Sequence, residues 1–395
     1  MKKSLLKILA FFVVLVASLP IFLVATNFKV YADGHEHDEI TSEWDSDNSL
    51  PSSYGNYYLT KDVTISSTWY PSRGVKLCLN GHSITMTGEG SVICIHGEGN
   101  AGGDYPVSIY DCSDVEHKYR INEEGLAVVD DTLTENYETF KGGYITGGNS
   151  ADDGGCINIY HEETELRTST NLLSLNGVNL VGNKAAKRGG AIYSARSPRK
   201  NCIIYLNDVS IIGNVAGDTA GAIYHESNNK WLAINSANIS KNTSTNAPAG
   251  IFEESEISVR GKVYIFDNKL TNGVQSDIVN THANQDKFTV SGKLEEGSRI
   301  GYTLIKSQKI RNYYKEFDAN DPTKNNDADP NTIFISNSIH SLVRAQDSKD
   351  DLQVLSVIAE EYTTHYDGNP HSIYFINDVE SINGTIKYRT EKYGE

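Results

Sequence analysis

The segment Gly189-Gly190-Ala191-Ile192-Tyr193 is one of four similar segments in the chain. Their second glycines are Gly155, Gly190, Gly221 and Gly250. Between them lies a second recurring strand that closes with an asparagine, at Asn183, Asn214, Asn242 and Asn268. A unit of roughly 30 residues that holds only short strands cannot bury its apolar side chains alone, so neighbouring units must stack on one another.

Stacking places equivalent side chains above one another, because each copy of the repeat adds about 4.8 Å to the stack. Ile192 and Ile223 are then expected in one inward-facing apolar ladder. The aligned asparagines are expected to stack at a turn, where this residue tolerates a left-handed backbone and can bond to the next copy. Alternating strands alone would also suit a β-sandwich. The repeat favours an all-β fold of the right-handed parallel β-helix type, which is a solenoid.

Changes in composition divide the chain into five parts. We expect a signal peptide at residues 1–32, an amino-terminal tail and cap at 33–56, the β-helix at 57–305, a linker with short strands at 306–358 and a partial Ig-like β segment at 359–395. The last part is shorter than the ~100 residues of a typical sandwich domain, so we expect the natural chain to continue.

The first residues carry the features of an export signal. Lys2 and Lys3 precede an apolar run from Leu5 to Ala25, and small residues close the segment at Ala32. A run of roughly 20 apolar residues is also long enough to stay in the membrane as an uncleaved anchor. Lys7 inside the run and the small-residue ending favour cleavage. We expect a secreted or cell wall-attached extracellular protein, with membrane contact only through the signal or an anchor.

The charge of the chain argues against one class of partner. The net charge is −16, and removal of residues 1–32 takes away four lysines and no acidic residue, which makes it −20. Such an acidic protein is a poor partner for nucleic acid. It suits a soluble extracellular protein that contacts a glycan or another ligand on a host or bacterial surface, and we expect it to be a monomer.

Five cysteines are present, at Cys78, Cys94, Cys112, Cys156 and Cys202. Export would permit disulfides, but an odd number leaves at least one thiol unpaired. Each cysteine stands in an apolar strand context, so we interpret them as small hydrophobic residues in a core rather than as bridges or metal ligands. A zinc site made of thiolates is not expected, because no Cys-x-x-Cys spacing occurs.

Several segments resemble a known group of proteins. Residues 55–65 (Gly-Asn-Tyr-Tyr-Leu-Thr-Lys-Asp-Val-Thr-Ile), residues 77–84 (Leu-Cys-Leu-Asn-Gly-His-Ser-Ile) and the Gly-Gly-Ala-Ile-Tyr repeats resemble secreted right-handed β-helix proteins of Gram-positive gut bacteria. Those proteins are similar in fold to the pectate lyase superfamily. Residues 366–371 (Tyr-Asp-Gly-Asn-Pro-His) resemble the start of bacterial Ig-like repeats, which are strung along cell-surface proteins.

The resemblance implies where catalysis would be found, if there is any. Polysaccharide lyases of this fold use acidic Ca²⁺ ligands beside an Arg or Lys base. The nearest approach in this chain is Asp152 and Asp153, with Arg188 one repeat later. The alternative interpretation is that the two aspartates form a polar turn. The Asn-x-Asp, Gly-His-Gly and Arg-x-Lys set of the hydrolases of this fold is missing in the expected order, so we expect no catalytic site and no cofactor, with Ca²⁺ as the only candidate ion.

Two acidic segments contain residue types that bind metals. His35 and His37 lie among acidic residues near the predicted mature amino terminus, and Asp318 and Asp321 lie in a loop rich in Asp and Asn. A solvated tail and a solvated loop are the alternative interpretations. The loop lacks the twelve-residue spacing with a closing Glu that is typical of an EF-hand.

Tyrosines are the candidate ligand-binding residues. Tyr119 and Tyr137 belong to residues 114–139, which interrupt the repeat and form either a ligand-contacting flap or a loop that packs back on the repeats. Tyr160, Tyr193 and Tyr224 are expected in register at strand ends, as an aromatic strip if they face outward and as core caps if they face inward.

The leading hypothesis for function is therefore an adhesin-like or glycan-binding surface protein without an evident catalytic site. The first alternative is a pectate lyase-like enzyme, a polysaccharide lyase or glycoside hydrolase acting on an acidic polysaccharide. The second is a purely structural spacer. Convergence of several acidic residues on Arg188 in a groove would favour the lyase.

Overall fold

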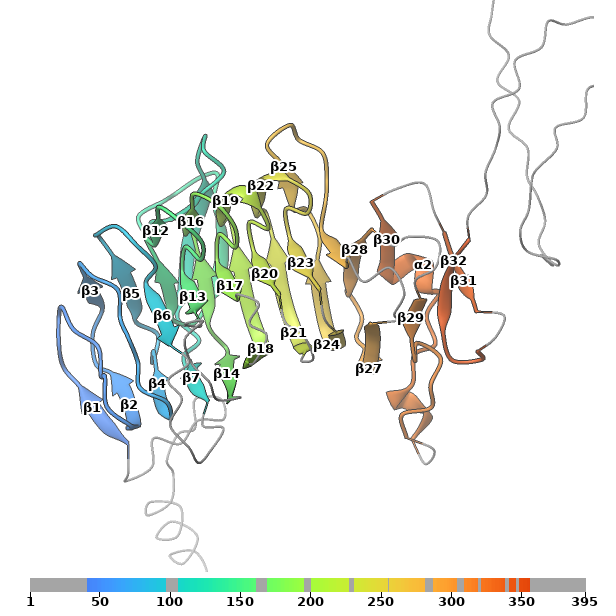
Figure 1. Ribbon diagram of the computed structural model, residues 1–395, viewed down its shortest axis with the longest axis horizontal. Coiled ribbons are helices and arrows are strands. Elements are labelled where there is room, and N and C mark those ends of the chain that lie inside the picture. The colour runs from blue at the N-terminus through green and yellow to red at the C-terminus, as the bar shows by residue number, and fades with distance from the viewer. Residues whose placement is uncertain are drawn as a thin grey trace, which may run out of the picture.

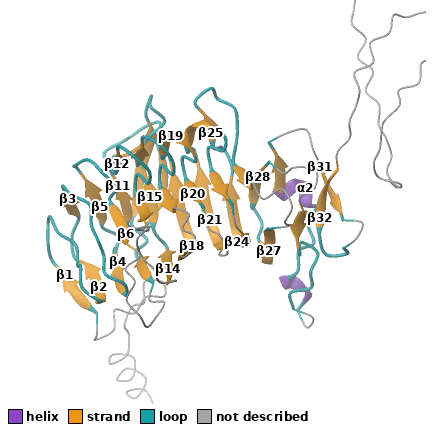
Figure 2. Ribbon diagram, viewed as in Figure 1, coloured by secondary structure: helices purple, strands orange, loops and turns teal. Residues whose placement is uncertain are grey.

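The computed structural model describes residues 41–96, 106–160, 169–194, 200–226, 231–254, 256–280, 287–303, 309–318, 321–337, 341–345 and 348–355. Strands account for nearly all regular structure in these ranges (Figure 2). The two helices, η1 (Pro322–Lys324) and α2 (Pro330–Ile333), are each a single turn. The predicted all-β class is confirmed. The signal at residues 1–32 and the Ig-like segment at 359–395 lie outside the described residues.

Three sheets contain strands that pair in parallel over long stretches of the chain, and Figure 1 shows the strands following chain order along the molecule. The long sheet contains β1 (Ser42–Trp44), β2 (Gly55–Leu59), β3 (Val63–Ile65), β4 (Val75–Cys78), β5 (Ser83–Met86), β7 (Val107–Tyr110), β11 (Tyr144–Thr146), β14 (Ser169–Asn176), β15 (Asn179–Val181), β18 (Lys200–Ile212), β21 (Trp231–Ser240), β24 (Glu256–Ile265), β27 (Phe288–Leu294), β28 (Arg299–Tyr302), β29 (Lys309–Arg311), β30 (Phe334–Ser336), β31 (Ser341–Arg344) and β32 (Leu352–Leu355).

The two other parallel sheets consist of shorter strands. The six-stranded sheet contains β6 (Ile93–His96), β13 (Ile157–Tyr160), β17 (Ile192–Ser194), β20 (Ile223–His225), β23 (Ile251–Glu253) and β26 (Ile278–Asn280). The five-stranded sheet contains β12 (Asn149–Ser150), β16 (Lys184–Ala185), β19 (Val215–Thr219), β22 (Thr243–Asn246) and β25 (Lys269–Leu270). A separate antiparallel sheet of three strands, here called the flap, contains β8 (Glu116–Ile121), β9 (Ala127–Val129) and β10 (Glu138–Lys141).

Equivalent residues of the repeat pair directly with one another, as the repeat predicts. Ile192 pairs with Ile157 on one side and with Ile223 on the other. Both neighbours are fully buried, as is Ile192 itself. The predicted apolar ladder is therefore confirmed. Burial of each such side chain contributes about 1.5–3 kcal/mol, so the ladder is a principal source of stability.

The asparagines form the second predicted ladder, and it is fully buried. The side-chain oxygen of Asn214 accepts hydrogen bonds from the backbone nitrogen and Nδ2 of Asn183, at 2.9 and 3.0 Å. Asn214 in turn donates to Asn242, and Asn242 donates to Asn268. The carboxylate of Asp277 accepts the last two bonds from Asn268, at 2.9 and 2.8 Å. Each amide satisfies buried backbone groups that would otherwise lack partners.

The repeated glycines are required by close approach between backbones. A Cβ atom at Gly221 would lie 2.4 Å from the carbonyl oxygen of Thr243, and one at Gly190 would lie 2.4 Å from the carbonyl oxygen of Gly221. No real Cβ contact is that short, and a backbone atom cannot swing away. The glycines are therefore a packing requirement of the repeat.

The two ends of the long sheet are closed differently. At the amino-terminal end β1 pairs in parallel with β2, and the ring of Trp44 packs edge-on against Tyr57. At the other end β32 pairs antiparallel with both β29 and β31. Residues 306–358, expected as a linker with short strands, thus contribute strands to the long sheet. Among the described residues β1 is the outermost strand at its end, and its length of three residues keeps that edge short.

Candidate ligand-binding groove

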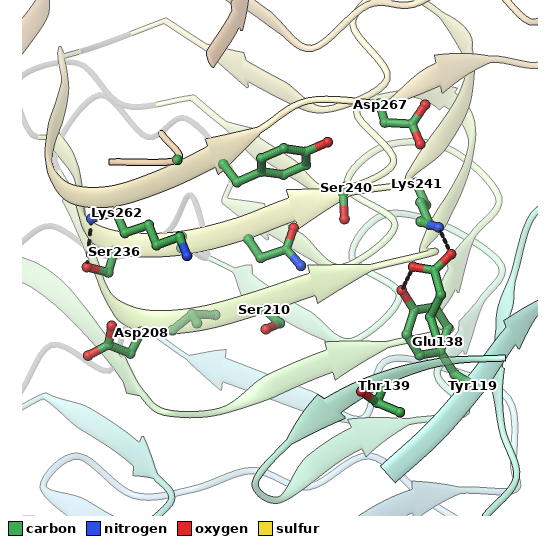
Figure 3. A pocket seen from close by; sticks show the side chains of 15 residues that line it. Tyr119, Glu138, Thr139, Asp208, Ser210, Ser236, Ser240, Lys241, Lys262 and Asp267 are labelled. Atoms are coloured by element: carbon green, nitrogen blue, oxygen red, sulfur yellow. Dashed lines mark hydrogen bonds and ion pairs between the residues drawn. The ribbon is translucent and has the colours of Figure 1, made fainter. Parts of the chain in front are cut away.

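An open groove of about 730 Å³ lies on the outer side of the long sheet, beside the flap (Figure 3). Its lining is mostly polar. The lining residues are Tyr119, Glu138, Thr139, Asp208, Val209, Ser210, Ser236, Ala237, Asn238, Ser240, Lys241, Lys262, Tyr264, Asp267 and Gly297.

The floor of the groove is a column of aligned residues on three neighbouring strands. Ser210 on β18 pairs with Asn238 on β21, and Asn238 pairs with Tyr264 on β24. Each is partly exposed, whereas the residues on either side of it in the strand are buried in the core. Alternation along a strand therefore points this column outward. The column brings together a hydroxyl, an amide and an aromatic ring.

The flap forms one wall because it packs back onto the long sheet. Tyr119 and Phe140 of the flap form a buried cluster with Val181 and Ile212, which are outward residues of the sheet. In the next strand, the position of Ile212 is occupied by Ser240. This change from apolar to polar marks the place where the flap ends and the groove begins. The segment thus packs back on the repeats, which was one of the two expectations for residues 114–139, and Tyr119 and Glu138 of the flap line the groove.

A corner column next to the floor explains why the flap can approach so closely. Gly182 and Gly213 have positive φ angles of 65° and 57°, and a Cβ atom at either would collide with Ala127 of the flap. Beyond the flap, the following strands carry Lys241 and Asp267 at the same corner, also with positive φ. Glycine therefore stands under the flap, and charged side chains stand where the groove opens.

Opposite charges lie at both ends of the groove (Figure 3). At one end Lys241 forms an ion pair with Glu138, which also accepts a hydrogen bond from the hydroxyl of Tyr119 at 2.9 Å. Burial acts to raise the pKa of Glu138, but the bonds from Lys241 and Tyr119 outweigh it and hold that pKa below its usual value. Asp208 and Lys262 line the other end.

One atom of the floor has unused hydrogen-bonding capacity. Within the described part of the chain, the side-chain oxygen of Asn238 is shielded from solvent and accepts no hydrogen bond. A buried acceptor without a partner costs roughly 1–3 kcal/mol. A ligand that donates a hydrogen bond would recover that free energy once the amide turns this oxygen toward the groove, which Asn238 lines as a partly exposed residue.

The predicted tyrosines do not gather into one site. Tyr119 is buried and its hydroxyl is bound to Glu138, so it supports the wall. Tyr137 lies in the flap outside the groove lining, with the Lys118 ammonium 4.6 Å from its ring centroid. Of these two tyrosines, only Tyr119 lines the groove.

The predicted register of the three strand-end tyrosines is wrong for one of them. Tyr193 pairs with Tyr224, and Tyr224 pairs with Phe252, but the residue that pairs with Tyr193 on the other side is Asn158. Tyr160 lies two residues further along β13 and is 44% exposed. Register is set by the aligned isoleucines, so a tyrosine at a strand end is displaced when the strand has a different length.

Tyr193 and Tyr224 are both buried, although they lie on the outer side of their sheet. Their rings stack at 5.5 Å between centroids, and the guanidinium of Arg188 lies 4.8 Å from each centroid. The rings and the cation therefore cover one another. This arrangement is a structural cluster rather than an open aromatic strip.

The candidate catalytic residues are paired with one another or with neighbours. Asp153 binds Arg188 in a bidentate manner, at 3.0 Å to Nε and 2.9 Å to Nη2, and Asp152 pairs with Lys187 at 2.6 Å. Hydrogen bonding to Asp153 raises the pKa of Arg188. A general base needs a lowered pKa, so this pairing acts against that role.

The candidate metal ligands are placed as follows. His35 and His37 lie outside the described residues. Asp318 and Asp321 both face the ammonium of Lys324, at 2.9 and 3.7 Å. The lysine therefore stands where a bound metal ion would have to lie. No group of three His, Cys, Asp or Glu side chains suited to a metal ion is found in the described ranges.

Sequence reasoning missed the groove floor. Ser210, Asn238 and Tyr264 each stand between two buried residues of a strand, and this alternation is a signal that points them outward. Nothing local shows that the flap ends beside them, because the flap is far away in sequence.

No helix within the described ranges is long and apolar enough to cross a membrane. Comparisons with protein-family models, curated proteins and solved structures found no match to this chain.

Proposed function

We propose that this protein is an exported surface protein that binds a glycan in the groove between the long sheet and the flap. The proposal includes the finer fold, a right-handed parallel β-helix followed by a partial Ig-like segment. The observation that carries it is the outward column of Ser210, Asn238 and Tyr264, which is open beside the flap.

The parallel register supports the β-helix. Copies of the repeat pair in order in all three parallel sheets, for example at Lys184, Val215 and Thr243 in the five-stranded sheet. A chain that adds one strand to each sheet per repeat winds as a coil, with its core enclosed between the sheets. Such a coil presents long outer faces, and extended glycans suit an extended surface.

The chemistry of the floor fits a sugar. A sugar has hydroxyl groups that donate and accept hydrogen bonds, and an apolar ring face that packs on aromatic rings. Asn238 offers a partly exposed amide, Ser210 offers a hydroxyl, and Tyr264 offers a partly exposed ring. The charges at the groove ends are of both signs, so the groove does not select strongly for a polyanion.

Binding is favoured over catalysis by the state of Glu138, one of the three carboxylates that line the groove with Asp208 and Asp267. Glycoside hydrolysis requires a carboxylic acid with a raised pKa, placed opposite a second carboxylate. The pKa of Glu138 is instead lowered, and its carboxylate is engaged by Lys241 and Tyr119. Arg188, the candidate lyase base, is held by Asp153.

The test is a glycan array with the wild-type protein, followed by calorimetric titration of the strongest hit against variants. We expect Tyr264→Ala and Asn238→Ala each to weaken binding about tenfold or more, which corresponds to ~1.4 kcal/mol. The matched control is Tyr70→Ala, because Tyr70 is 57% exposed and lies outside the groove lining. Unchanged affinity in both groove variants would reject the groove. Release of unsaturated sugar products from an acidic polysaccharide would favour the lyase instead.

A further inference from the structure

Two of the five thiols lie close together near the amino-terminal end of the long sheet. The Sγ atoms of Cys78 and Cys112 are 3.4 Å apart. Cys78 ends β4, and Cys112 follows two residues after the end of β7, the strand that pairs with β4. The register partner of Cys78 is Tyr110, and Cys112 lies two residues further along the chain, where its side chain turns back toward Cys78.

The turn that carries Cys112 is fixed by its buried neighbour Asp111. The carboxylate of Asp111 accepts hydrogen bonds from the backbone nitrogens of Gly81, at 2.7 Å, and Ser113, at 2.9 Å. These bonds tie the segment after Cys78 to the segment that contains Cys112. The two thiols are therefore held side by side by backbone contacts and do not depend on each other for their positions.

We propose that Cys78 and Cys112 are a disulfide-forming pair, oxidised by exchange with a protein or small-molecule disulfide. The inference is independent of the proposed glycan groove. It revises the interpretation of all five cysteines as inert core residues. Cys156 and Cys202 are buried as that interpretation expects, whereas Cys94 and Cys112 are only half-buried.

Exposure and acidity set the order of the exchange. The hydrogen bond from Cys78 lowers the pKa of the Cys112 thiol, and Cys112 is the more accessible of the two. The Cys112 thiolate attacks one sulfur of the oxidant, and the oxidant's disulfide bond breaks to release one thiol. Cys78 then gives up its proton and attacks the sulfur of Cys112, which releases the second thiol. The oxidant gains the two electrons and two protons that the pair loses.

The experiment uses the full chain, reduced and then incubated with oxidised glutathione under native conditions. After the oxidant is removed and the protein is unfolded in denaturant, we expect three of the five thiols to be titratable. The mass should fall by about 2 Da, because two hydrogens are lost. Peptide mapping without reduction should recover a cross-linked pair that contains Cys78 and Cys112.

Two variants separate this pair from general thiol reactivity. Cys78→Ser should accumulate a glutathione adduct on Cys112, because the second attack is missing. Cys112→Ser should stay unmodified at Cys78, because Cys78 is buried. Cys94→Ser is the matched control and should still form the cross-link. The proposal is overturned if the wild-type protein keeps five thiols or if the cross-link joins other cysteines. Mapping of the wild-type protein decides this even if a variant fails to fold.

Discussion

Two columns of polar side chains run across the repeats, and they behave in opposite ways. The asparagine ladder is fully buried, repeats one residue type, and satisfies its amides from copy to copy. The groove column is outward and changes residue at each copy, from Ser210 to Asn238 to Tyr264. It also leaves one amide oxygen without a partner in the described residues.

The difference separates what the repeat needs from what a ligand needs. A buried position must satisfy the same backbone groups in every copy, so the same side chain recurs. An outward position has no such requirement, so its residues are free to suit a ligand. We therefore expect substitutions in the ladder to change stability, and substitutions in the groove column to change binding.

The largest expected effect is that of breaking the ladder in its middle. Asn214→Ala removes the acceptor used by Asn183 and the donor to the carbonyl oxygens of Leu180 and Ile212, all buried. We expect the free energy of unfolding to fall by roughly 3–5 kcal/mol, because several buried groups lose partners at once. Urea unfolding followed by circular dichroism measures the loss.

The matched control for the ladder is an asparagine of the groove. Asn238→Ala should not lower the free energy of unfolding, because no buried group depends on its side-chain oxygen and the loss of an unpaired buried acceptor acts to stabilise the fold. Equal losses in the two variants would remove the distinction between the columns.

A second buried polar pair, His225 and Glu253 on neighbouring strands, makes the stability of the fold depend on pH. His225 pairs with Glu253 at 2.8 Å, and both side chains are fully buried. Burial acts to lower the pKa of His225, but Glu253 and the carbonyl oxygen of Cys202 raise it by more, to about 10. The unfolded value is about 6.5. The contribution of protonated His225 to the free energy of unfolding is therefore fully present below about pH 6.5, and it is lost as the pH rises through about 10.

We expect the free energy of unfolding to fall by roughly 2–4 kcal/mol between pH 7 and pH 10. Urea unfolding at several pH values measures the slope, and His225→Gln should flatten it. A slope that is the same in His225→Gln would show that this pair does not titrate as described.

The glycine column tests whether packing between copies is as tight as the ladder requires. Gly221→Ala places a Cβ atom against the backbone of Thr243, so we expect a loss of about 2 kcal/mol. Gly292→Ala is the control, because the nearest atom to its Cβ is the Cβ of Arg260 at 3.2 Å, a contact that a shift of a few tenths of an ångström relieves. Thermal unfolding should separate the two variants. A smaller loss for Gly221→Ala than for Gly292→Ala would contradict the packing.

The smallest expected effect on stability is that of filling the groove. Ser210→Trp adds bulk on the outer side, where Ser210 is partly exposed, so the unfolding free energy should stay within about 0.5 kcal/mol. Glycan binding should be lost at the same time, because the indole ring occupies the floor. Retained binding with full affinity would place the ligand elsewhere.

The sequence was sufficient for the repeating parts and insufficient for the parts made by distant contacts. The stacking of Ile192 on Ile223 and of the four asparagines on one another was predictable, because residues that recur at the same place in a repeat take equivalent positions in the stack. The groove was not, because its wall depends on flap residues such as Phe140 packing on Ile212, far along the chain. The register of Tyr160 was misjudged from its place at a strand end, and the approach of Cys78 to Cys112 follows from pairing in a region where the repeat is irregular.

The stacking of successive copies is tested most directly by a distance between spin labels on equivalent residues. Asn149 and Lys269 belong to one column of the five-stranded sheet, separated by four strand spacings. The labels are placed at these two positions in a background with Cys94→Ser and Cys112→Ser, and pulsed electron resonance measures their separation. The account predicts one narrow distribution near about 19 Å, from four spacings of about 4.8 Å. A broad distribution, or a separation beyond about 30 Å, would contradict it.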